Sequence, residues 1–122
     1  MKQSKRALLY SLLGKLPDRN RPISAESTSQ AARNGYLLET LRLDLNGLEV
    51  VPAYFIKSLD SSGPGPAILY NHAHGGEYSI GKKELIEGRD FMTLPPYAVA
   101  LTRLGCSVLC IDAWCFGERS HR

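Results

Sequence analysis

The chain has 122 residues, enough for one domain with a hydrophobic core and too few for two. Its composition, 43% hydrophobic and 22% charged, is that of a soluble globular protein. The net charge of +3 is uneven: residues 1–22 hold six Lys/Arg against one acid and carry +5, so the remainder carries −2. Because these charges are not interleaved with a series of aromatic residues, the sequence argues against a nucleic-acid partner.

Residues 1–35 are predicted to form an amphipathic leader helix and a loop. The apolar stretch 7–14 resembles the core of a signal peptide, but basic residues follow it and no small-residue cleavage site does. No stretch is long enough to span a membrane. Residues 22–35 are small and polar, which favours a loop. Four leucines share one helical stripe in the leader: Leu9, Leu12, Leu13 and Leu16.

An antiparallel hairpin is predicted next. Residues 36–45 alternate apolar and polar side chains from Leu38 onward, as a half-buried strand does. Asn46-Gly47 then gives a strong short-range hairpin signal, and residues 48–56 supply the returning strand. Pro52 within that strand indicates an edge position or a bulge.

A crossover unit of parallel strands follows a turn rich in Ser, Gly and Pro. Residues 67–71 form a short, continuous apolar run, which predicts a strand buried on both faces. Residues 82–87 and 95–104 favour two helical pieces, the second with prolines at its start. Residues 106–112 are a second apolar strand. This order places the protein in the α/β class with a mixed sheet.

Chemistry in open α/β sheets lies beyond the carboxyl ends of the parallel strands, which directs attention to the loops after Asn71 and after Asp112. In the first loop, residues 76–83 nearly match the phosphate-binding pattern G-x-x-x-x-G-K-[ST]. However, Lys83 occupies the hydroxyl position and Glu77 would bring a carboxylate to the phosphate. A metal-dependent hydrolase using His72 and His74 is an alternative, but a catalytic zinc requires a third protein ligand.

An oxyanion hole is the interpretation favoured for the first loop. His74-Gly75-Gly76 ends a buried strand, and glycines allow main-chain N–H groups to approach a substrate and stabilise a tetrahedral intermediate. A histidine before such glycines commonly holds the loop in place. A tight Gly-Gly turn without a chemical role, or a module that binds an anion without turnover, are the alternatives.

The second loop supports this interpretation. Asp112 ends a strand, a glycine follows five residues later, and Glu118 comes next. Together, NHAHGGEY and LTRLGCSVLCIDAWCFGER resemble the α/β-hydrolase family, in particular its dienelactone-hydrolase and acetyl-esterase-like branch. The resemblance covers residues 36–119, so residues 36–122 are predicted to be a partial α/β-hydrolase domain.

The resemblance implies a serine hydrolase that acts on carboxylic esters or related small acyl compounds and requires no cofactor or metal. The implied backbone donors are Gly75, Gly76 and Glu77. His74 and Asp112 are implied to position the loops. The residues after Asp112 that could line a pocket, or equally pack, are Trp114 and Phe116.

The sequence departs from this family in one major respect, because no G-x-S-x-G nucleophile elbow occurs in the 122 residues. The chain is therefore expected to be an amino-terminal portion lacking the catalytic Ser, Asp and His, and inactive alone. Strand 67–71 would then be an exposed sheet edge that favours self-association. The three cysteines lack metal-site spacing, which favours buried thiols in a reducing, cytoplasmic environment: Cys106, Cys110 and Cys115.

Overall fold

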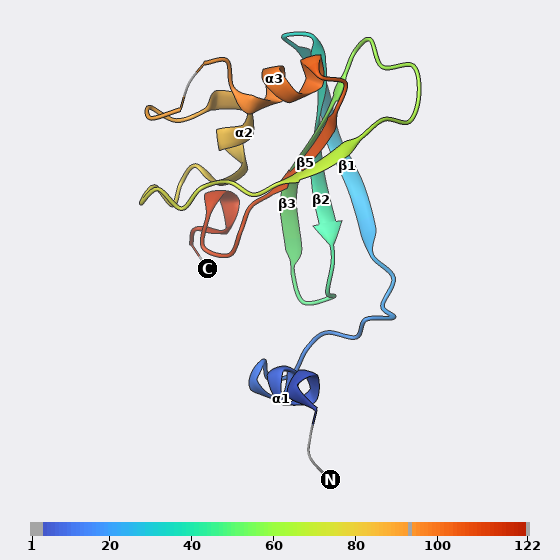
Figure 1. Cartoon of the computed structure of the whole chain (residues 1–122), viewed down its shortest axis with the longest axis vertical. Coiled ribbons are helices and arrows are strands. Elements are labelled where there is room, and N and C mark those ends of the chain that lie inside the picture. The colour runs from blue at the N-terminus through green and yellow to red at the C-terminus, as the bar shows by residue number, and fades with distance from the viewer. Residues whose placement is uncertain (1–3, 93, 122) are drawn as a thin grey trace.

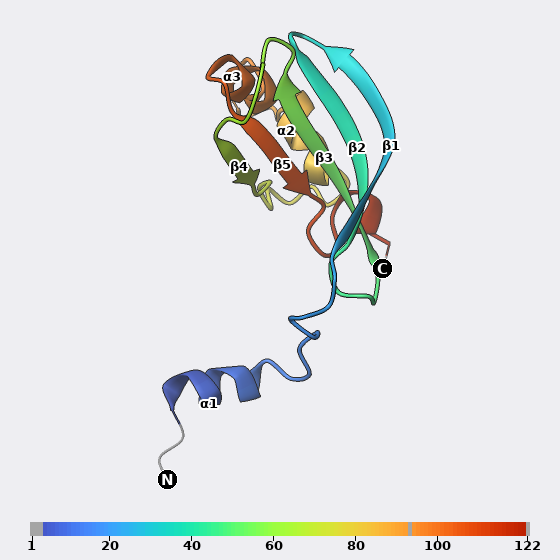
Figure 2. The same ribbon diagram turned by 90° about the vertical axis from the view of Figure 1, so that its right-hand side faces the viewer.

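The structure, a computed structural model, describes residues 4–92 and 94–121. They form one mixed sheet of five strands in the order β1-β2-β3-β5-β4, with α2 and α3 on the same side of it (Figure 1, Figure 2). Residues 1–3 of the predicted leader, and residue 122, lie outside the described part. In chain order the elements are α1 (Lys5–Leu12), β1 (Ser24–Arg33), β2 (Tyr36–Asp44), β3 (Val50–Ser58), β4 (Ala67–Tyr70), η1 (Gly81–Lys83), α2 (Glu84–Glu87), α3 (Tyr97–Arg103), β5 (Ser107–Ile111) and η2 (Gly117–Arg119).

The prediction of a loop at residues 22–35 is wrong. Most of this segment is strand β1, which pairs antiparallel with β2 from Arg33 opposite Tyr36 to Ser24 opposite Asp44. All ten residues of β1 are exposed, so no buried stripe marks the strand in the sequence. The turn 34–35 has positive φ at both residues, as a tight hairpin requires. The sheet therefore extends across the boundary predicted at residue 35.

The predicted hairpin of β2 and β3 is confirmed, but its connection is longer than a two-residue turn. The antiparallel ladder ends with Asp44 opposite Val50. Asp44 Oδ1 accepts a hydrogen bond from Gly47 N–H at 2.7 Å, and Asn46 Oδ1 accepts one from Leu48 N–H at 2.9 Å. The side-chain oxygens thus close the loop that follows β2.

Pro52 does not mark an edge strand, because β3 lies between β2 and β5. Its carbonyl accepts a hydrogen bond from Asp112 N–H at 2.9 Å, just past the end of β5. A strand residue directs its N–H and C=O to the same side, so the N–H that proline lacks would face the Asp112 carbonyl. The proline is tolerated because the Asp112 carbonyl accepts a hydrogen bond from Arg119 Nη1 instead, at 2.8 Å.

The predicted parallel crossover is confirmed: β4 and β5 pair in parallel through η1, α2 and α3. Strand β4 lies at the sheet edge, as expected for the partial domain. The prediction that it is buried on both faces is wrong, because its residues alternate between exposed and half-buried. Ile68 and Tyr70 pack toward the helices, whereas Leu69 is 63% exposed.

The hydrophobic core lies between the helices and one face of the sheet. Strand residues Ile56 and Val108 are fully buried there, as are Leu85 of α2 and Ala98 of α3. A second, smaller cluster around Ala53 lies nearer the other end of β3. This packing fixes α2 against the sheet and thereby sets the position of the loop that leads into it.

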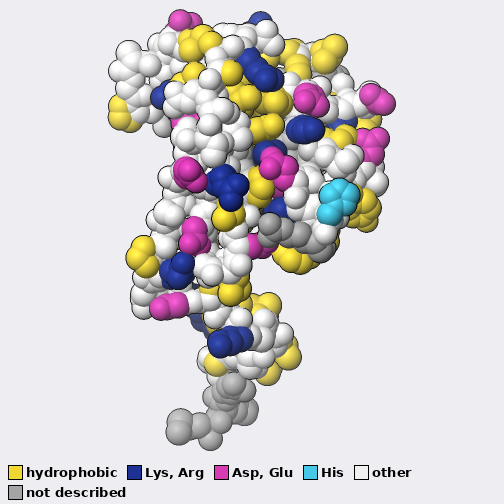
Figure 3. Space-filling model, turned by 180° about the vertical axis from the view of Figure 1, so that it is seen from behind, with side chains coloured by type: hydrophobic (Ala, Val, Ile, Leu, Met, Phe, Trp, Pro, Cys, Tyr) yellow, Lys and Arg dark blue, Asp and Glu magenta, His cyan; other side chains and the backbone are white. Residues whose placement is uncertain are grey.

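Helix α1 is present as predicted but lies apart from the sheet (Figure 1, Figure 2). The Ser4 side chain caps it by accepting a hydrogen bond from Ala7 N–H. No residue of α1 is buried, and Figure 3 shows its hydrophobic side chains at the surface. No helix within residues 4–92 and 94–121 is long and apolar enough to cross a membrane. The exposed leucines of this region are Leu8, Leu9, Leu12, Leu13 and Leu16.

The three cysteines are free thiols, and only one of them matches the prediction of buried thiols. Cys110 of β5 is fully buried, and burial raises the pKa of its thiol to about 12. Cys106 and Cys115 are half-buried; Cys106 lies just before that strand and Cys115 lies after its end.

Candidate active site

Two loops meet at the carboxyl ends of β4 and β5. One follows Tyr70 and leads into η1, and the other follows Ile111 and leads into η2. They are joined by a hydrogen bond from Gly117 N–H to Tyr78 O at 2.7 Å, and η1 also contacts η2. The two loops that the sequence singled out therefore form one continuous surface.

His74 holds its own loop, which is the arrangement expected of a loop-positioning residue. Its Nδ1 accepts a hydrogen bond from Gly76 N–H at 3.2 Å, and its Nε2 lies 3.2 Å from the Tyr78 hydroxyl. This geometry corrects one predicted donor, because the Gly76 amide is already paired with the imidazole. Gly76 is therefore not a free oxyanion donor in this conformation.

Other amides of the loop remain available. Within the described part of the chain, the N–H groups of His74, Gly75 and Glu77 have no protein acceptor. Gly75 has φ +52°, a left-handed conformation that glycine adopts without strain. The His74 amide was not among the donors predicted from the sequence, which were those of the Gly-Gly pair and of the residue after it.

His72 bridges the two loops and does not offer a free ring nitrogen. Its Nε2 accepts a hydrogen bond from Ala113 N–H at 3.1 Å, so Nδ1 carries the proton and lies 3.2 Å from Ala73 O. Each nitrogen of His74 is likewise in a hydrogen-bond contact. Among residues 4–92 and 94–121, no group of three or more His, Cys, Asp or Glu side chains is placed to hold a metal ion. The described residues thus offer no ligand set to the metal-dependent alternative.

Asp112 is buried at the centre of the second loop and joins three segments. Its Oδ1 accepts a hydrogen bond from Lys82 N–H at 2.7 Å, and its Oδ2 accepts from Lys82 Nζ at 2.8 Å and from Glu118 N–H at 3.1 Å. Its main-chain carbonyl accepts from Arg119 Nη1 at 2.8 Å. These contacts are those of a structural residue that fixes the loop.

Two glycines leave room for the Asp112 carboxylate. A Cβ at Gly81 would lie 2.2 Å from Asp112 Oδ1, and one at Gly117 would lie 2.3 Å from it. Both glycines have positive φ, +53° and +54°. The glycine five residues after Asp112 is therefore explained by close packing against this carboxylate.

Lys82 is paired with carboxylates, which argues against a phosphate-binding loop. Its side chain is 1% exposed and forms ion pairs with Asp112 and Glu118. Burial lowers the pKa of Lys82, but the hydrogen bonds to Asp112 and Glu118 raise it more, so the net shift is upward. The ammonium group and the Lys82 N–H are thus both engaged within the protein.

Sequence reasoning missed a buried cluster beneath the first loop. Glu84 accepts hydrogen bonds from the Tyr70 hydroxyl at 2.6 Å and from Ala73 N–H at 3.0 Å, and it forms an ion pair with Arg89. Burial raises the pKa of Glu84, but these hydrogen bonds lower it more, and it lies below its ordinary value. Burial and the hydrogen bond to Glu84 raise the pKa of Tyr70.

Phe116 and Trp114, the two possible pocket residues, differ in role. Phe116 is 8% exposed, and its ring packs against His72, His74 and Tyr78 at centroid distances of 4.9, 5.3 and 5.0 Å. It is therefore a packing residue that joins the loops. Trp114 is 58% exposed, with the Arg119 guanidinium 5.2 Å from its ring centroid. Of these two side chains, Trp114 is the one exposed enough to contact another molecule.

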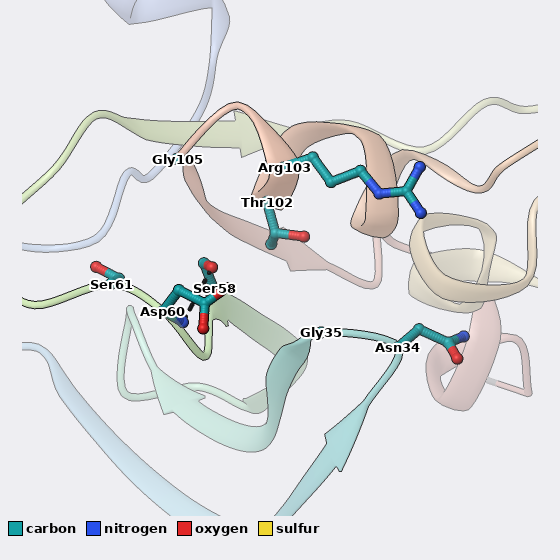
Figure 4. Close-up of a pocket in the computed structure, with 8 residues that line it drawn as sticks. All are labelled: Asn34, Gly35, Ser58, Asp60, Ser61, Thr102, Arg103 and Gly105. Carbon is teal, nitrogen blue, oxygen red and sulfur yellow. Dashed lines mark hydrogen bonds between the residues drawn. The ribbon is translucent and has the colours of Figure 1, made fainter.

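A cavity of 590 Å³ lies away from these loops, near the amino end of β5 (Figure 4). Two of its lining side chains form hydrogen bonds within the fold: the Thr102 hydroxyl donates to Ala98 O at 2.6 Å, and Ser58 Oγ accepts from Asp60 N–H at 3.3 Å. It contains no histidine or cysteine. The loops are therefore the better candidate for a functional site. The lining residues are Asn34, Gly35, Ser58, Asp60, Ser61, Thr102, Arg103 and Gly105.

Comparisons with known proteins give two similarities. No family model matches the chain. A Bacillus subtilis (strain 168) protein named "Putative hydrolase YtaP" is 51% identical over 119 residues, which are 98% of this chain and 40% of that protein. The crystal structure of a Bacteroides fragilis NCTC 9343 protein, titled a "putative acetyl xylan esterase", matches with a TM-score of 0.59 at 16% identity. That match covers 98% of this chain and 40% of the other.

The chain thus spans about two fifths of the length of the proteins it matches. The structural similarity, at this low identity, concerns the fold alone, and it confirms the predicted α/β class with a hairpin and a parallel crossover in one mixed sheet. The esterase-like hydrolase fold is supported by both similarities. The dienelactone-hydrolase branch stays a prediction.

Proposed function

We propose that the chain forms part of a serine-type hydrolase acting on carboxylic esters or related acyl compounds, in which it supplies the oxyanion hole. The observation that carries this proposal is a group of unpaired main-chain amides at the carboxyl end of a parallel strand. These amides belong to His74, Gly75 and Glu77, in a loop held from several sides. Gly76, whose amide is paired with His74, is left out of the donor set.

The proposed mechanism uses these amides when negative charge develops on the substrate. Attack on an ester carbonyl converts its oxygen to an alkoxide, and N–H groups already aimed at that position stabilise the tetrahedral intermediate. A fixed loop is an advantage here, because its donors need no reorganisation during the reaction. Phe116 and the imidazole of His74 provide this rigidity in the proposal.

The attacking group in this proposal comes from outside the 122 residues, because they contain no G-x-S-x-G. The relatives' names, a hydrolase and an acetyl xylan esterase, support acyl chemistry as the reaction class. Asp112 is given a structural role, since its carboxylate oxygens are occupied by Lys82 and Glu118 N–H. The proposal leaves the acyl substrate open within esters and related compounds.

A first experiment tests the chain alone. The 122-residue protein is incubated with p-nitrophenyl acetate and with a fluorophosphonate probe, and no turnover and no serine labelling are expected. Labelling at a serine of the chain would contradict the assignment of the nucleophile to another segment. Saturable binding of acetate without any hydrolysis, both here and in the hybrid described next, would favour a non-catalytic anion-binding module.

A second experiment tests the oxyanion hole in a hybrid, in which this chain replaces the matched segment of the Bacillus subtilis relative. His74, Gly75 and Glu77 are replaced one at a time by their α-hydroxy acids, which removes a single N–H and retains the side chain. Loss of a true donor should lower kcat for p-nitrophenyl acetate by about 100-fold. The matched control is the same replacement at Gly63, an exposed turn residue before β4. Unchanged kcat at all three positions would refute the oxyanion hole.

A further inference from the structure

A buried ion pair holds one residue of the loop by both of its main-chain polar groups. Glu84 accepts the Ala73 N–H on both carboxylate oxygens, at 3.0 and 3.1 Å. Arg89 donates from Nη2 to Ala73 O at 2.7 Å, and its Nε forms the ion pair with Glu84. The peptide groups on either side of Ala73 are thus fixed by two charged side chains that are themselves paired.

The pair is deeply buried, with side chains that are 1% and 2% exposed for Arg89 and Glu84. Removing two charges from water is costly, and well-packed apolar side chains often give equal or greater stability at such positions. Stability alone therefore gives a weak reason for this pair. Its hydrogen bonds go to the backbone of Ala73, which points to control of the conformation of the loop.

Arg89 also lies directly beneath the residues that carry the free amides. A Cβ at Gly75 would lie 2.7 Å from Arg89 Nη1, so the guanidinium is in close contact with the glycine backbone. The same nitrogen is 3.7 Å from the Glu77 carboxylate, and it is buried without a hydrogen-bond partner in the described residues. One guanidinium therefore underlies the loop from Ala73 to Glu77.

We infer that Glu84 and Arg89 are positioning residues that set where the His74 and Gly75 amides point, an inference that rests on the proposed function. They act through Ala73 and do not touch the substrate. Oxyanion donors work only at about 2.7–3.1 Å from the developing alkoxide, and a displacement of about 1 Å can reduce a rate by about 100-fold. A clamp on the residue immediately before the donors is well placed to prevent such a displacement.

The variant Arg89→Lys separates positioning from charge. Lysine keeps the positive charge but lacks the planar guanidinium group. It therefore cannot contact Glu84, Ala73 O and the backbone of Gly75 at the same time. The matched control is Arg103→Lys, at an exposed arginine at the end of α3. A second variant, Arg89→Ala, leaves a space beside a cavity of 470 Å³ that Arg89 helps to line, so added guanidinium ions can enter it.

Amide hydrogen exchange tests the clamp directly, in both the 122-residue chain and the hybrid. The Ala73 amide should be protected in the parent protein and should exchange at least 10-fold faster in Arg89→Lys. The exchange rate of the Val108 amide of β5 should be the same in Arg89→Lys as in the parent. The exchange rate of the Ala73 amide should be the same in Arg103→Lys as in the parent. Equal protection of Ala73 in parent and variant would overturn the inference.

Kinetics of the hybrid test the link to catalysis. Arg89→Lys should lower kcat for p-nitrophenyl acetate by about 10- to 100-fold with KM changed less than about twofold, because oxyanion donors act mainly in the transition state. Guanidinium should restore part of the kcat of Arg89→Ala. The core variant Ile56→Val, which lowers stability without touching the loop, should retain kcat and show no response to guanidinium.

The two kinds of failure are distinguishable. If Ala73 exchanges faster in Arg89→Lys but kcat is unchanged, the contribution of Glu84 and Arg89 to catalysis is refuted. The oxyanion hole itself is tested separately, by the α-hydroxy acid replacements. A parent hybrid that does not hydrolyse any ester would refute the proposed function. The exchange of the Ala73 amide would then still decide whether the ion pair positions the loop.

Discussion

At the scale of single residues, Asp112 and Glu84 each organise one loop through a buried carboxylate. Asp112 accepts from the backbone of Lys82 and of Glu118, and so joins the start of η1 to η2. Glu84 accepts from the backbone of Ala73 in the other loop. Both carboxylates are buried, and their hydrogen bonds to backbone N–H groups hold the loops in place.

The glycine beside Asp112 gives a prediction. Gly117→Ala should lower the free energy of unfolding of the hybrid by about 2–4 kcal/mol, because its Cβ would lie 2.3 Å from Asp112 Oδ1 and its φ is +54°. Gly105→Ala is the matched control, with φ +79° and no atom within 4 Å of the added Cβ, and should lose about 1 kcal/mol. Urea denaturation measures both. Equal losses would contradict the steric argument.

The sequence predicts part of the site and misses the rest for a physical reason. The Gly-Gly loop, His74 and Asp112 follow apolar strand runs, so their place at strand ends can be predicted. The buried charges cannot be predicted in this way. Lys82 and Lys83 are neighbouring residues of the same type, yet of the two only Lys82 is buried. Which of them turns inward depends on the distant Asp112.

At the scale of elements, α2 is joined to the loop after β4 chiefly through charge. This helix has only four residues. Glu84 at its start accepts hydrogen bonds from the Tyr70 hydroxyl and from Ala73 N–H. Its apolar contribution comes from Leu85, which is fully buried. So short a helix has little stability of its own and depends on these tertiary contacts.

The junction should be sensitive to acid. The pKa of Glu84 in the folded protein lies below its ordinary value of 4.5, so its stabilising contribution is complete above that pH and is lost as the pH falls through the folded pKa. Between about pH 5 and about pH 3, the free energy of unfolding of the hybrid should therefore fall less steeply in Glu84→Gln than in the parent. Glu87→Gln, at an exposed position of the same helix, is the control and should follow the parent. Parallel pH profiles for Glu84→Gln and the parent would refute this.

Strand β1 illustrates why one element could not be predicted. Its sequence, SAESTSQAAR, lacks apolar alternation because both of its faces are exposed. It is a strand only because its backbone pairs with β2, from Ser24 opposite Asp44 to Arg33 opposite Tyr36. Strands β2, β3 and β5 bury one or both faces. Their sequences therefore contain the apolar patterns from which the strands were predicted.

At the scale of the whole molecule, apolar groups and an unpaired sheet edge remain at the surface. Among the residues that the structure describes, strand β4 pairs only with β5, and its Leu69 is 63% exposed. The leucines of α1 are exposed as well. A free edge of this kind is a template for pairing with another chain.

We therefore expect the 122-residue chain to self-associate through β4. Leu69→Lys places a charge on the edge strand and should shift sedimentation velocity profiles from oligomers toward monomer, by at least twofold in monomer fraction. Leu104→Lys, at a 75% exposed position that follows α3, is the control and should leave the distribution unchanged. A monomeric parent chain at micromolar concentration would contradict the expectation.

The connectivity of the sheet also has a kinetic consequence. Strands β1, β2 and β3 pair with strands that are next to them in the chain. The ladder between β3 and β5 instead joins residues far apart in the sequence, such as Ala53 and Ile111. Local contacts close small loops and form quickly, while distant ones form late. During synthesis the three-stranded meander emerges before the loops that follow β4 and β5 and can fold before they exist, so those loops are assembled onto a surface that is already in place.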